Sequence, residues 1–498
     1  MLSRAAFWRR PLFFLTMTRL RSLPPLLFGV HLLILLITVA PTIHAYHLDS
    51  AEFVIGAHTL GIVHSPGYPL YLMIAKGFTW LPFGSIALRV NLLSALALAG
   101  TTPFLYLALH NLVKDGVIAA GATLATVFSF HVWQMGVSAE VYAPQLFTLA
   151  VTGWLLTRGE RTPLHGLALS YGLALAMNPA SVLLAPGVGV VALSWRRPVW
   201  AYVRGAVIGV VVVLLSLIYF PVRYHEGTLY NAAGYYDGAG EFVSLPLDTM
   251  RGVWWMVRAV QFRTLYFYEG VVPSWTQVQD VFFVVGSNTY WLGAVLALVG
   301  LIAMANTARR QLVAWTVLFV PFIYFYTTYG AIDRTTMIGP AHALLALPMA
   351  HGLLVLLDGL PQRVKTGLIG MAVLLMLGVN LPGFIAQRSD NSYANAVRAI
   401  ENMPPDAVVF GPWELIVSMQ YVQLVDGERD DLTLYNLFLF QDDSFEAYIT
   451  ETAPALNVPV VFLQPSGNTP AQNALVAEAV QFTPLVADGG VVGYLATF

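Results

Sequence analysis

The sequence predicts an α-helical polytopic membrane protein that carries a small α/β domain at its C-terminal end. Hydrophobic residues make up 57% of the 498 residues and charged residues only 10%, whereas soluble domains carry about 25% charged residues. The charges are also unevenly distributed, because 14 of the 27 acidic residues but only two of the 25 basic residues lie from Asp390 onward. Most of the chain therefore belongs in lipid, and its last part belongs in water.

The apolar segments predict the membrane-embedded part. A spanning helix needs about 20 mainly apolar residues, and the pattern indicates about 11 such spans. Two of them, on either side of "MNPAS", are short and form a kinked or re-entrant pair, because Pro179 removes a helix hydrogen bond and restricts Asn178. The predicted spans are 24–44, 87–112, 116–135, 138–157, 163–178, 179–194, 201–222, 286–305, 311–329, 337–357 and 367–386.

The basic residues predict the orientation. With a cytoplasmic N-terminus, 15 of the 25 basic residues lie inside, as the positive-inside rule expects. They are Arg4, Arg9, Arg10, Arg19, Arg21, Lys114, Arg158, Arg161, Arg196, Arg197, Arg204, Arg309, Arg310, Arg363 and Lys365. An odd number of spans places the acidic C-terminal part outside. We therefore expect a multi-span domain over 1–387, with outer loops 45–86 and 223–285, and a soluble extracytoplasmic α/β domain over 388–498.

The C-terminal part mixes two kinds of pattern. "SYANAVRAIENM" and "DSFEAYITETA" have helical spacing, whereas "DAVVFG" and "VPVVFL" are short β-rich runs. No glycine-rich nucleotide fingerprint follows these runs, and no basic stripe indicates nucleic acid as a partner. The chain has no cysteine, which excludes disulfides and thiolate chemistry.

Titratable residues gather directly behind the first span, in "LDSAEFVIGAHTLGIVHSPGYPLY" (48–71). Asp49 and Glu52 have the spacing of a capping box, which predicts the start of a helix. Capping alone does not require charge, and a carboxylate at bilayer depth costs about 2.5–3.5 kcal/mol and usually marks a functional site. Both interpretations stay open. The aromatic stretch after Pro66 and Pro69 predicts a helix lying in the membrane interface.

This segment, followed by "LPFGSIALRVNLLSAL" (81–96), resembles the start of a multi-span family whose vertebrate member is a transmembrane protein O-mannosyltransferase. The resemblance continues through "SAEVYAPQLFTLA", "GLALAMNPAS" and "IYFPVRYHEG", weakens over 227–285, and returns loosely in "YVQLVDGERDDL". Ala51 and Ser65 are mild departures from the family pattern. Pro179 is a larger one, because related proteins often carry an Asn-His pair there.

The resemblance implies a GT-C glycosyltransferase, which transfers a sugar from a polyprenyl-phosphate donor on the extracytoplasmic side of the membrane. Mannose is one candidate sugar, and the acceptor hydroxyl can belong to a protein, a glycolipid or a polysaccharide. In that class an acidic residue of the first outer loop is central to catalysis, and the matching residue is Asp49, with Glu52 beside it. A positioned carboxylate that takes the acceptor proton contributes typically about 10²–10⁴-fold. A second acid would raise one pKa of the pair by like-charge repulsion.

Other residues are candidates for substrate binding. Arg223 is the leading phosphate ligand, because a guanidinium binds phosphate oxygens in a bidentate manner; its alternative is an ordinary interfacial arginine. Arg89 is a further basic group, with a helix-end charge as its alternative. Glu140 either positions the acceptor, holds a metal, or stabilises a first helical turn. The remaining candidates are His64, Tyr68 and Tyr142.

No cofactor is required by these patterns, and the metal ligands stay unknown. Two carboxylates three residues apart, together with Glu140, offer oxygens suited to a divalent cation such as Mg²⁺ or Mn²⁺. The competing interpretation of the whole chain is a polytopic transporter or flippase of lipid-linked or small solutes. Transporters usually show repeats with matching broken helices, which the sequence lacks.

Overall fold

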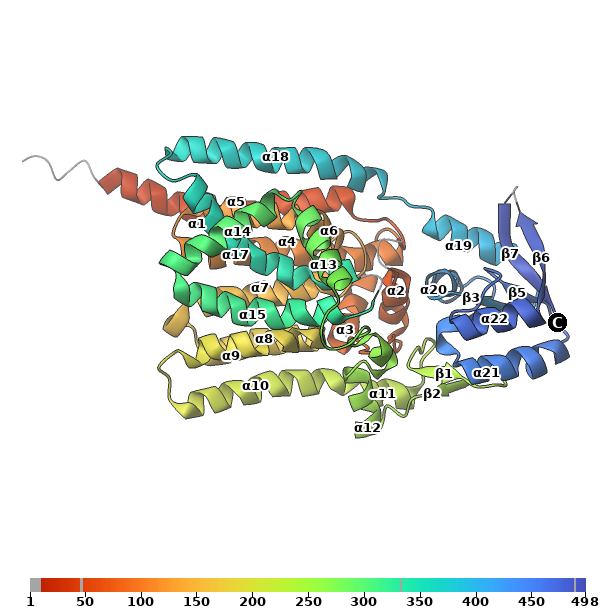
Figure 1. Ribbon diagram of the computed structural model, residues 1–498. Helices are drawn as coiled ribbons and strands as arrows, with labels where there is room; N and C mark the ends of the chain where they lie inside the picture. Colours follow the sequence, from red (N-terminus) through yellow and green to blue (C-terminus); the bar gives the residue numbers. More distant parts are fainter. Residues whose placement is uncertain (1–9, 45–47, 332–333, 488–489) are drawn as a thin grey trace, which may run out of the picture.

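The computed structural model of the protein describes residues 10–44, 48–331, 334–487 and 490–498. Arg4 and Arg9 of the predicted cytoplasmic N-terminus, and residues 45–47 of the predicted first outer loop, lie outside this part of the chain. Two regions are visible in Figure 1: a bundle of long helices, and an α/β region with a sheet at one end of it.

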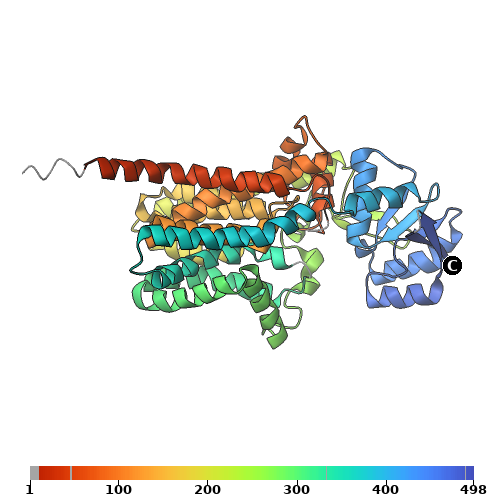
Figure 2. The same ribbon diagram turned by 90° about the horizontal axis from the view of Figure 1, so that it is seen from above.

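A helix lies at each predicted span, and the helices run side by side along one axis (Figures 1 and 2). They are α1 (Arg10–Thr38), α4 (Ile86–Val113), α5 (Gly116–Val127), α7 (Tyr142–Thr157), α8 (Leu164–Met177), α9 (Ala185–Leu193), α10 (Val199–Leu217), α14 (Leu292–Thr307), α15 (Arg309–Thr328), α17 (Gly339–Leu356) and α18 (Gln362–Ala386). Small residues allow some of them to approach closely. A Cβ added to Gly300 of α14 would lie 1.7 Å from the carbonyl oxygen of Pro348 in α17.

Several of these helices are shorter than the sequence predicts. Among the described residues, five helices are long and apolar enough to cross a membrane: α4, α10 continued by α11 (Tyr219–Glu226), α15, α17 and α18. A bent pair, α13 (Trp275–Asn288) and α14, adds a sixth if it counts as one span, with a bend of 103°. The predicted span 116–135 is divided, because Ser129 has extended backbone between α5 and α6 (Phe130–Gln134). The predicted break at Pro179 is present, where α8 ends and a 3₁₀ turn, η2 (Pro179–Leu184), begins.

One end of the bundle carries the segments that connect these helices. There lie α2 (Ser50–Thr59), α3 (Pro69–Thr79), α11, the hairpin of β1 (Gly234–Tyr236) with β2 (Phe242–Ser244), α12 (Met250–Val257) and the 3₁₀ segment η3 (Val260–Leu265) (Figure 1). Two of these segments pair through their backbones, because Ile62 N–H donates to Tyr230 O at 2.9 Å and Ala232 N–H donates to Ile62 O at 2.7 Å. This pairing brings the first and second loops together.

The C-terminal region is a five-stranded mixed sheet with helices. Its strands lie in the order β4 (Thr433–Asn436), β3 (Val408–Gly411), β5 (Val460–Phe462), β7 (Gly490–Thr497) and β6 (Gln481–Ala487). β3 is parallel to β4 and β5, and β7 is antiparallel to β5 and β6. The two predicted β-rich runs are β3 and β5, both fully buried, which explains why they are continuously apolar. The helices are α19 (Ser392–Glu401), α20 (Trp413–Tyr421), α21 (Asp442–Ala447) and α22 (Pro470–Ala479).

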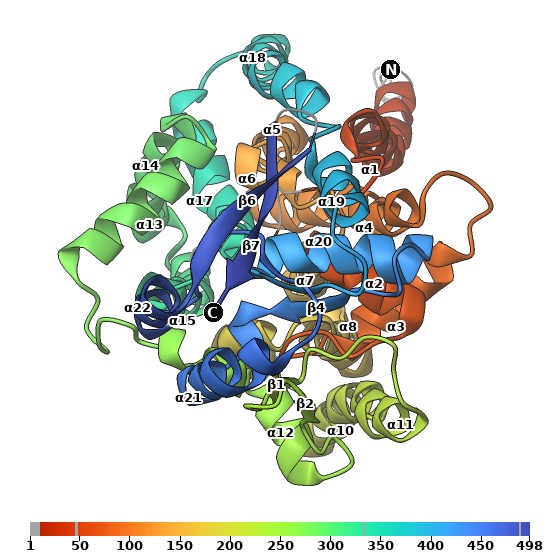
Figure 3. The same ribbon diagram turned by 90° about the vertical axis from the view of Figure 1, so that its right-hand side faces the viewer.

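The C-terminal region lies directly over the connecting segments, as the end-on view in Figure 3 shows. Tyr435 donates a hydrogen bond to Gly240 O at 3.0 Å, and Thr452 donates one to Gly238 O at 2.7 Å. On the other side, α20 packs against α2. The start of α2 is therefore enclosed between the helical bundle and the α/β region.

Candidate active site

Asp49, Glu52 and His64 form a compact cluster at the start of α2. One ligand-type atom from each of the three lies within 4.8 Å of the other two. The α2 helix places Asp49 and Glu52 one turn apart. A turn after α2 brings His64 back beside them, and within the described part of the chain this is the one cluster of three such residues that could hold a metal ion.

Glu52 is completely buried and is committed to neighbours within the protein. Its Oε1 accepts hydrogen bonds from the backbone N–H of His64 at 2.7 Å and from the hydroxyl of Tyr230 at 3.2 Å. Its Oε2 accepts a hydrogen bond from the ring Nδ1–H of His64. The predicted capping box is therefore wrong, because Asp49 occupies the N-cap position without a side-chain cap bond and Glu52 turns toward His64.

Asp49 is the more open carboxylate of the two. Its side chain is 22% exposed, whereas that of Glu52 is 0% exposed. Its Oδ2 lies 3.7 Å from the Nε2 of His64. The imidazole thus bridges the two carboxylates, with one ring nitrogen toward each. Asp49 is the acid that an incoming group can reach.

The surroundings of His64 favour the positively charged form of its ring. Burial by itself lowers the pKa of the imidazole, but the charges of Glu52 and Asp49, the hydrogen bond to Glu52 and the charge of Glu140 outweigh it and raise the pKa to about 10. The sequence predicted two carboxylates that repel each other. In the structure the imidazole of His64 lies between them, and in its charged form it offsets that repulsion.

Aromatic rings from three regions of the chain enclose His64. Tyr68 lies edge-on at 5.8 Å between ring centroids, Phe262 of η3 at 5.6 Å, and Trp413 of the C-terminal region at 5.5 Å. Tyr68 is held in the left-handed backbone region (φ 42°, ψ 52°) as the N-cap of α3. These rings keep water away from the buried side of the charged cluster.

Glu140 also belongs to this neighbourhood. It is 3% exposed, and its charge contributes to the raised pKa of His64 and of the Tyr68 hydroxyl. It precedes α7, so it does not occupy the first helical turn, and its Oε1 accepts the N–H of Val141 at 2.7 Å. Tyr142 is the first residue of α7 and is buried. Asp49 and Glu140, 91 positions apart by their numbers, thus face one charged cluster.

The two arginines predicted to bind substrate hold the backbone of the connecting segments. Arg223 donates from Nε to Leu60 O at 2.8 Å and pairs with Glu226. Because Leu60 is the C-cap of α2, this guanidinium neutralises the negative end of that helix. Arg89 donates to the carbonyl oxygens of Thr79, Phe83 and Gly84 at 2.8–2.9 Å. The donors that we expected to bind phosphate are therefore engaged by backbone carbonyl groups and, for Arg223, also by Glu226.

Two partners of the cluster were missed by the sequence analysis. Tyr230 donates to Glu52, and Gln261 accepts from the N–H and hydroxyl of Ser65 at 3.1 and 3.2 Å. Both lie in the aromatic-rich second loop, whose composition suggests either an interfacial aromatic belt or rings that stack on a sugar. The Ile62–Asn231 backbone bridge puts this loop beside the first one. Neither sequence segment contains a pattern from which that pairing could be predicted.

The fold is shared with solved membrane glycosyltransferases. The structure of ArnT from Cupriavidus metallidurans bound to undecaprenyl phosphate aligns with a TM-score of 0.58 over 95% of this chain and 97% of that chain, at 12% identity. The mycobacterial arabinofuranosyltransferase AftD aligns with a TM-score of 0.50 over 96% of this chain and 40% of that chain, at 13% identity. Identities this low establish a shared architecture alone. The chain has the multi-pass GT-C glycosyltransferase fold.

The sequence comparisons show that part of the chain resembles one family of glycosyltransferases. Residues 49–200 match the family model described as the protein O-mannosyl-transferase TMEM260 N-terminal domain. The protein O-mannosyl-transferase TMEM260 of Mus musculus is 43% identical over 98 residues, which are 19% of this chain and 14% of the mouse protein. The resemblance noted in the sequence is thereby confirmed, and the match includes Asp49, Glu52, His64 and Glu140 within the family model.

Proposed function

We propose that this protein is a membrane glycosyltransferase that moves a sugar, with mannose as the first candidate, from a polyprenyl-phosphate donor to an acceptor hydroxyl. One observation carries the proposal: within a GT-C fold, a partly exposed carboxylate, Asp49, is held against a charged His64 that is itself anchored by buried Glu52. The name of the mouse relative, a protein O-mannosyl-transferase, supports mannose and a protein acceptor, and the undecaprenyl phosphate bound to ArnT supports the donor class.

In the proposed reaction Asp49 acts as the general base. The acceptor oxygen forms a bond to the anomeric carbon, and its proton passes to the Asp49 carboxylate. The bond between that carbon and the phosphate oxygen breaks, and the electron pair leaves with the lipid phosphate. Attack on the face opposite the phosphate inverts the anomeric centre. His64 orients Asp49, while Glu52 and Tyr230 hold His64.

An apolar cavity of about 370 Å³ supports a lipid-linked donor. It lies among α4, α7, α9, α15 and α17, and along α7 it reaches from Leu146, near the cluster end, to Thr157 at the opposite end. Its wall is mostly aliphatic, and the polar groups in it are the hydroxyls of three Thr and one Ser together with Arg310 and Gln311 at the far end. An isoprenoid chain fits such a lining, because the cavity offers apolar contact along nearly the whole length of a helix.

The proposed orientation places this site outside the cell. The basic loops after α4, α7, α9 and α14 lie at the end of the bundle away from the α/β region (Figure 1). The positive-inside rule assigns that end to the cytoplasm. The cluster and the C-terminal region then face the extracytoplasmic leaflet, where a lipid-linked sugar is consumed.

The test is transfer by the purified full-length protein from polyprenyl-phosphate mannose and a panel of related donors, followed as release of the lipid phosphate. Asp49→Asn is expected to lower turnover by about 10²–10⁴-fold while donor binding persists. Asp443→Asn, on an exposed side chain of α21, is the matched control and keeps full activity. Unchanged transfer by Asp49→Asn, or translocation of the lipid-linked sugar without transfer, overturns the proposal.

A further inference from the structure

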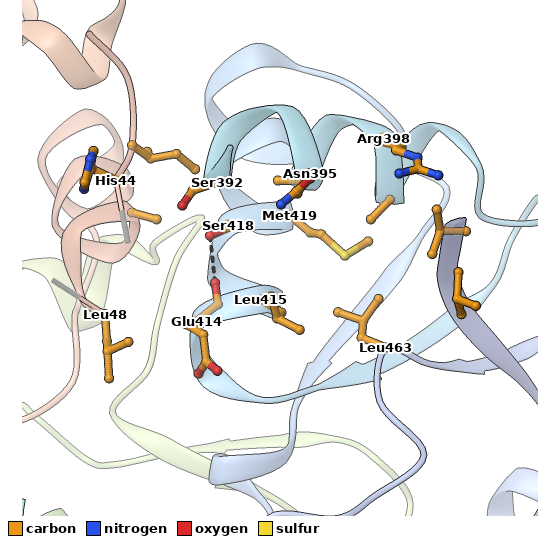
Figure 4. A pocket seen from close by; sticks show the side chains of 16 residues that line it. His44, Leu48, Ser392, Asn395, Arg398, Glu414, Leu415, Ser418, Met419 and Leu463 are labelled. Carbon is orange, nitrogen blue, oxygen red and sulfur yellow. Dashed lines mark hydrogen bonds between the residues drawn. The ribbon is translucent and has the colours of Figure 1, made fainter. Parts of the chain in front are cut away.

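A second cavity, of about 380 Å³, lies between the start of α2 and the C-terminal region (Figure 4). Leu48 and Ala51 form its wall on the membrane side. Residues of α19 and α20 form the opposite wall, among them Asn395, Arg398 and Glu414. Its volume is within the usual range for ligand sites, and it lies at an interface between two parts of the chain, where such sites often occur.

Three polar groups in this wall have unused hydrogen-bonding capacity. The carboxylate of Glu414 and the side-chain amide of Asn395 have no hydrogen-bond partner among the described residues, and Figure 4 shows only the backbone oxygen of Glu414 accepting a bond, from Ser418. The Nε–H of Arg398 is buried without a partner, while its Nη2 donates to Ala487 O and, at 3.4 Å, to Gly490 O. Of the three groups only the Nε of Arg398 is buried, whereas Asn395 is exposed and Glu414 is half-buried. A ligand that supplies an acceptor to Arg398 and donors to Glu414 makes hydrogen bonds that the protein itself leaves unmade.

The residues that line this cavity favour some classes of ligand over others. The carboxylate of Glu414 opposes an anion such as phosphate, and the three polar groups oppose a purely apolar lipid chain. Sugar rings are commonly held against aromatic faces, but none of the described lining residues is Phe, Tyr or Trp. Apolar residues make up most of the rest of the wall, including Leu415, Met419 and Leu463. His44, Ser392 and Ser418 add further polar groups. A polypeptide complements such a lining, because its backbone offers both hydrogen-bond donors and acceptors and its small side chains are apolar.

None of Asp49, Glu52 and His64 lines the cavity, but residues next to the cluster do. Leu48 and Ala51 flank Asp49 along the chain. Glu414 follows Trp413, whose ring lies edge-on to His64 at 5.5 Å. A segment bound in the cavity is therefore separated from the cluster only by the first turns of α2 and α20.

We propose that this cavity binds the acceptor as a polypeptide segment bearing a hydroxyl side chain, with Glu414, Asn395 and Arg398 as its hydrogen-bonding partners. The inference rests on the proposed transferase function and assigns its acceptor site. The C-terminal region is thus the acceptor-selecting part of the enzyme, and the apolar cavity of the bundle serves the donor.

The kinetic test uses the full-length protein with a fixed lipid donor and synthetic peptides that carry one Thr among Ala and Val residues. Glu414→Gln and Asn395→Ala are expected to raise the acceptor KM about tenfold each, with donor KM and kcat unchanged, because they remove ground-state binding. Glu446→Gln, on an exposed side chain of α21, is the matched control. Unchanged acceptor KM in both cavity variants, while the wild type turns over, overturns the acceptor site and leaves the transferase proposal intact.

A binding test independent of turnover uses the absence of cysteine in the chain. Leu415→Cys places one thiol in the cavity wall, and Glu446→Cys places one on the far surface. The Thr peptides are expected to slow maleimide labelling at position 415 and not at position 446. Equal labelling rates at position 415 with and without peptide, or protection by soluble oligosaccharides instead, overturn the assignment. If the wild type shows peptide protection but no sugar transfer, the transferase proposal fails on its own.

Discussion

Glu52 binds His64 through two different groups, the backbone N–H at 2.7 Å and the ring Nδ1–H. This double contact fixes both the position of the loop and the orientation of the imidazole. The opposite ring nitrogen then faces Asp49 at 3.7 Å. Buried Glu52 thus holds the His64 ring, and that ring in turn orients Asp49. The two carboxylates therefore have different roles.

Replacing Glu52 is expected to destabilise the protein as well as inactivate it. Glu52→Gln leaves the buried imidazolium without its partner, and breaking a buried pair in this way costs about 3–5 kcal/mol. A clear fall in the thermal midpoint of the detergent-solubilised protein should accompany loss of transfer. Asp49→Asn, by comparison, should leave the midpoint nearly unchanged, because Asp49 is the more open residue. Equal midpoints for wild type and Glu52→Gln would contradict the ion pair.

Alkaline pH is expected to weaken the fold through His64. The pKa of this residue rises from 6.5 to about 10 in the folded protein, because burial, which lowers the pKa, is outweighed by Glu52 and Asp49. A raised folded-state pKa stabilises the protein fully below about pH 6.5, and that contribution is lost as pH rises through about 10. Thermal midpoints measured from neutral pH to about pH 10 should fall more steeply for wild type than for His64→Gln. Parallel pH profiles for the two proteins would count against a charged His64.

Arg223 is expected to act on stability and not on donor binding. Arg223→Gln removes the guanidinium that caps α2 at Leu60 O, which should cost about 1 kcal/mol. The donor KM should stay at the wild-type value, because the donors of Arg223 are engaged by carbonyl groups and Glu226. Arg251→Gln, on an exposed side chain, is the control. A higher donor KM with an unchanged thermal midpoint would restore Arg223 as the phosphate ligand.

Trp413 is expected to position His64 through its ring alone. Its indole nitrogen is buried without a hydrogen-bond partner in the described structure, so Trp413→Phe keeps the edge contact and loses no bond. Trp413→Ala removes the ring and should lower kcat about tenfold or more, because small displacements of reacting groups are costly. The measurement is kcat as a function of pH for the wild type and for both variants. Similar losses in Phe and Ala variants would indicate a role for the nitrogen instead.

Chelation of divalent cations is expected to leave transfer intact. Both oxygens of Glu52 accept hydrogen bonds, from His64 and Tyr230, so a metal ion at the cluster would have to break the bond between Glu52 and the His64 ring. Transfer assays with and without EDTA, followed by addition of Mg²⁺ or Mn²⁺, measure this directly. Activity that disappears with EDTA and returns with Mn²⁺ would assign the cluster to a metal.

Hydropathy and charge were sufficient to predict the membrane-embedded bundle and the acidic α/β region. These properties are local, and a helix of apolar residues or a short buried strand is recognisable within one stretch of sequence. The strands β3 and β5 and the helix α19 lie where their patterns place them. Helix lengths were less predictable, because turns such as the one at Ser129 depend on neighbouring helices.

The candidate site was predictable only in part. The acidic motif identifies Asp49 as a candidate, because a charged residue beside an apolar span is energetically costly and usually marks a functional site. By itself the sequence therefore determined the membrane setting, the fold class and the segment that bears the carboxylates. Only the tertiary structure decided that Glu52 binds His64, that Arg223 caps α2, and that Trp413 from the far end of the chain adjoins the cluster. The physical reason is that hydropathy acts along neighbouring residues, whereas the partner of a buried charge is chosen by packing among segments hundreds of residues apart.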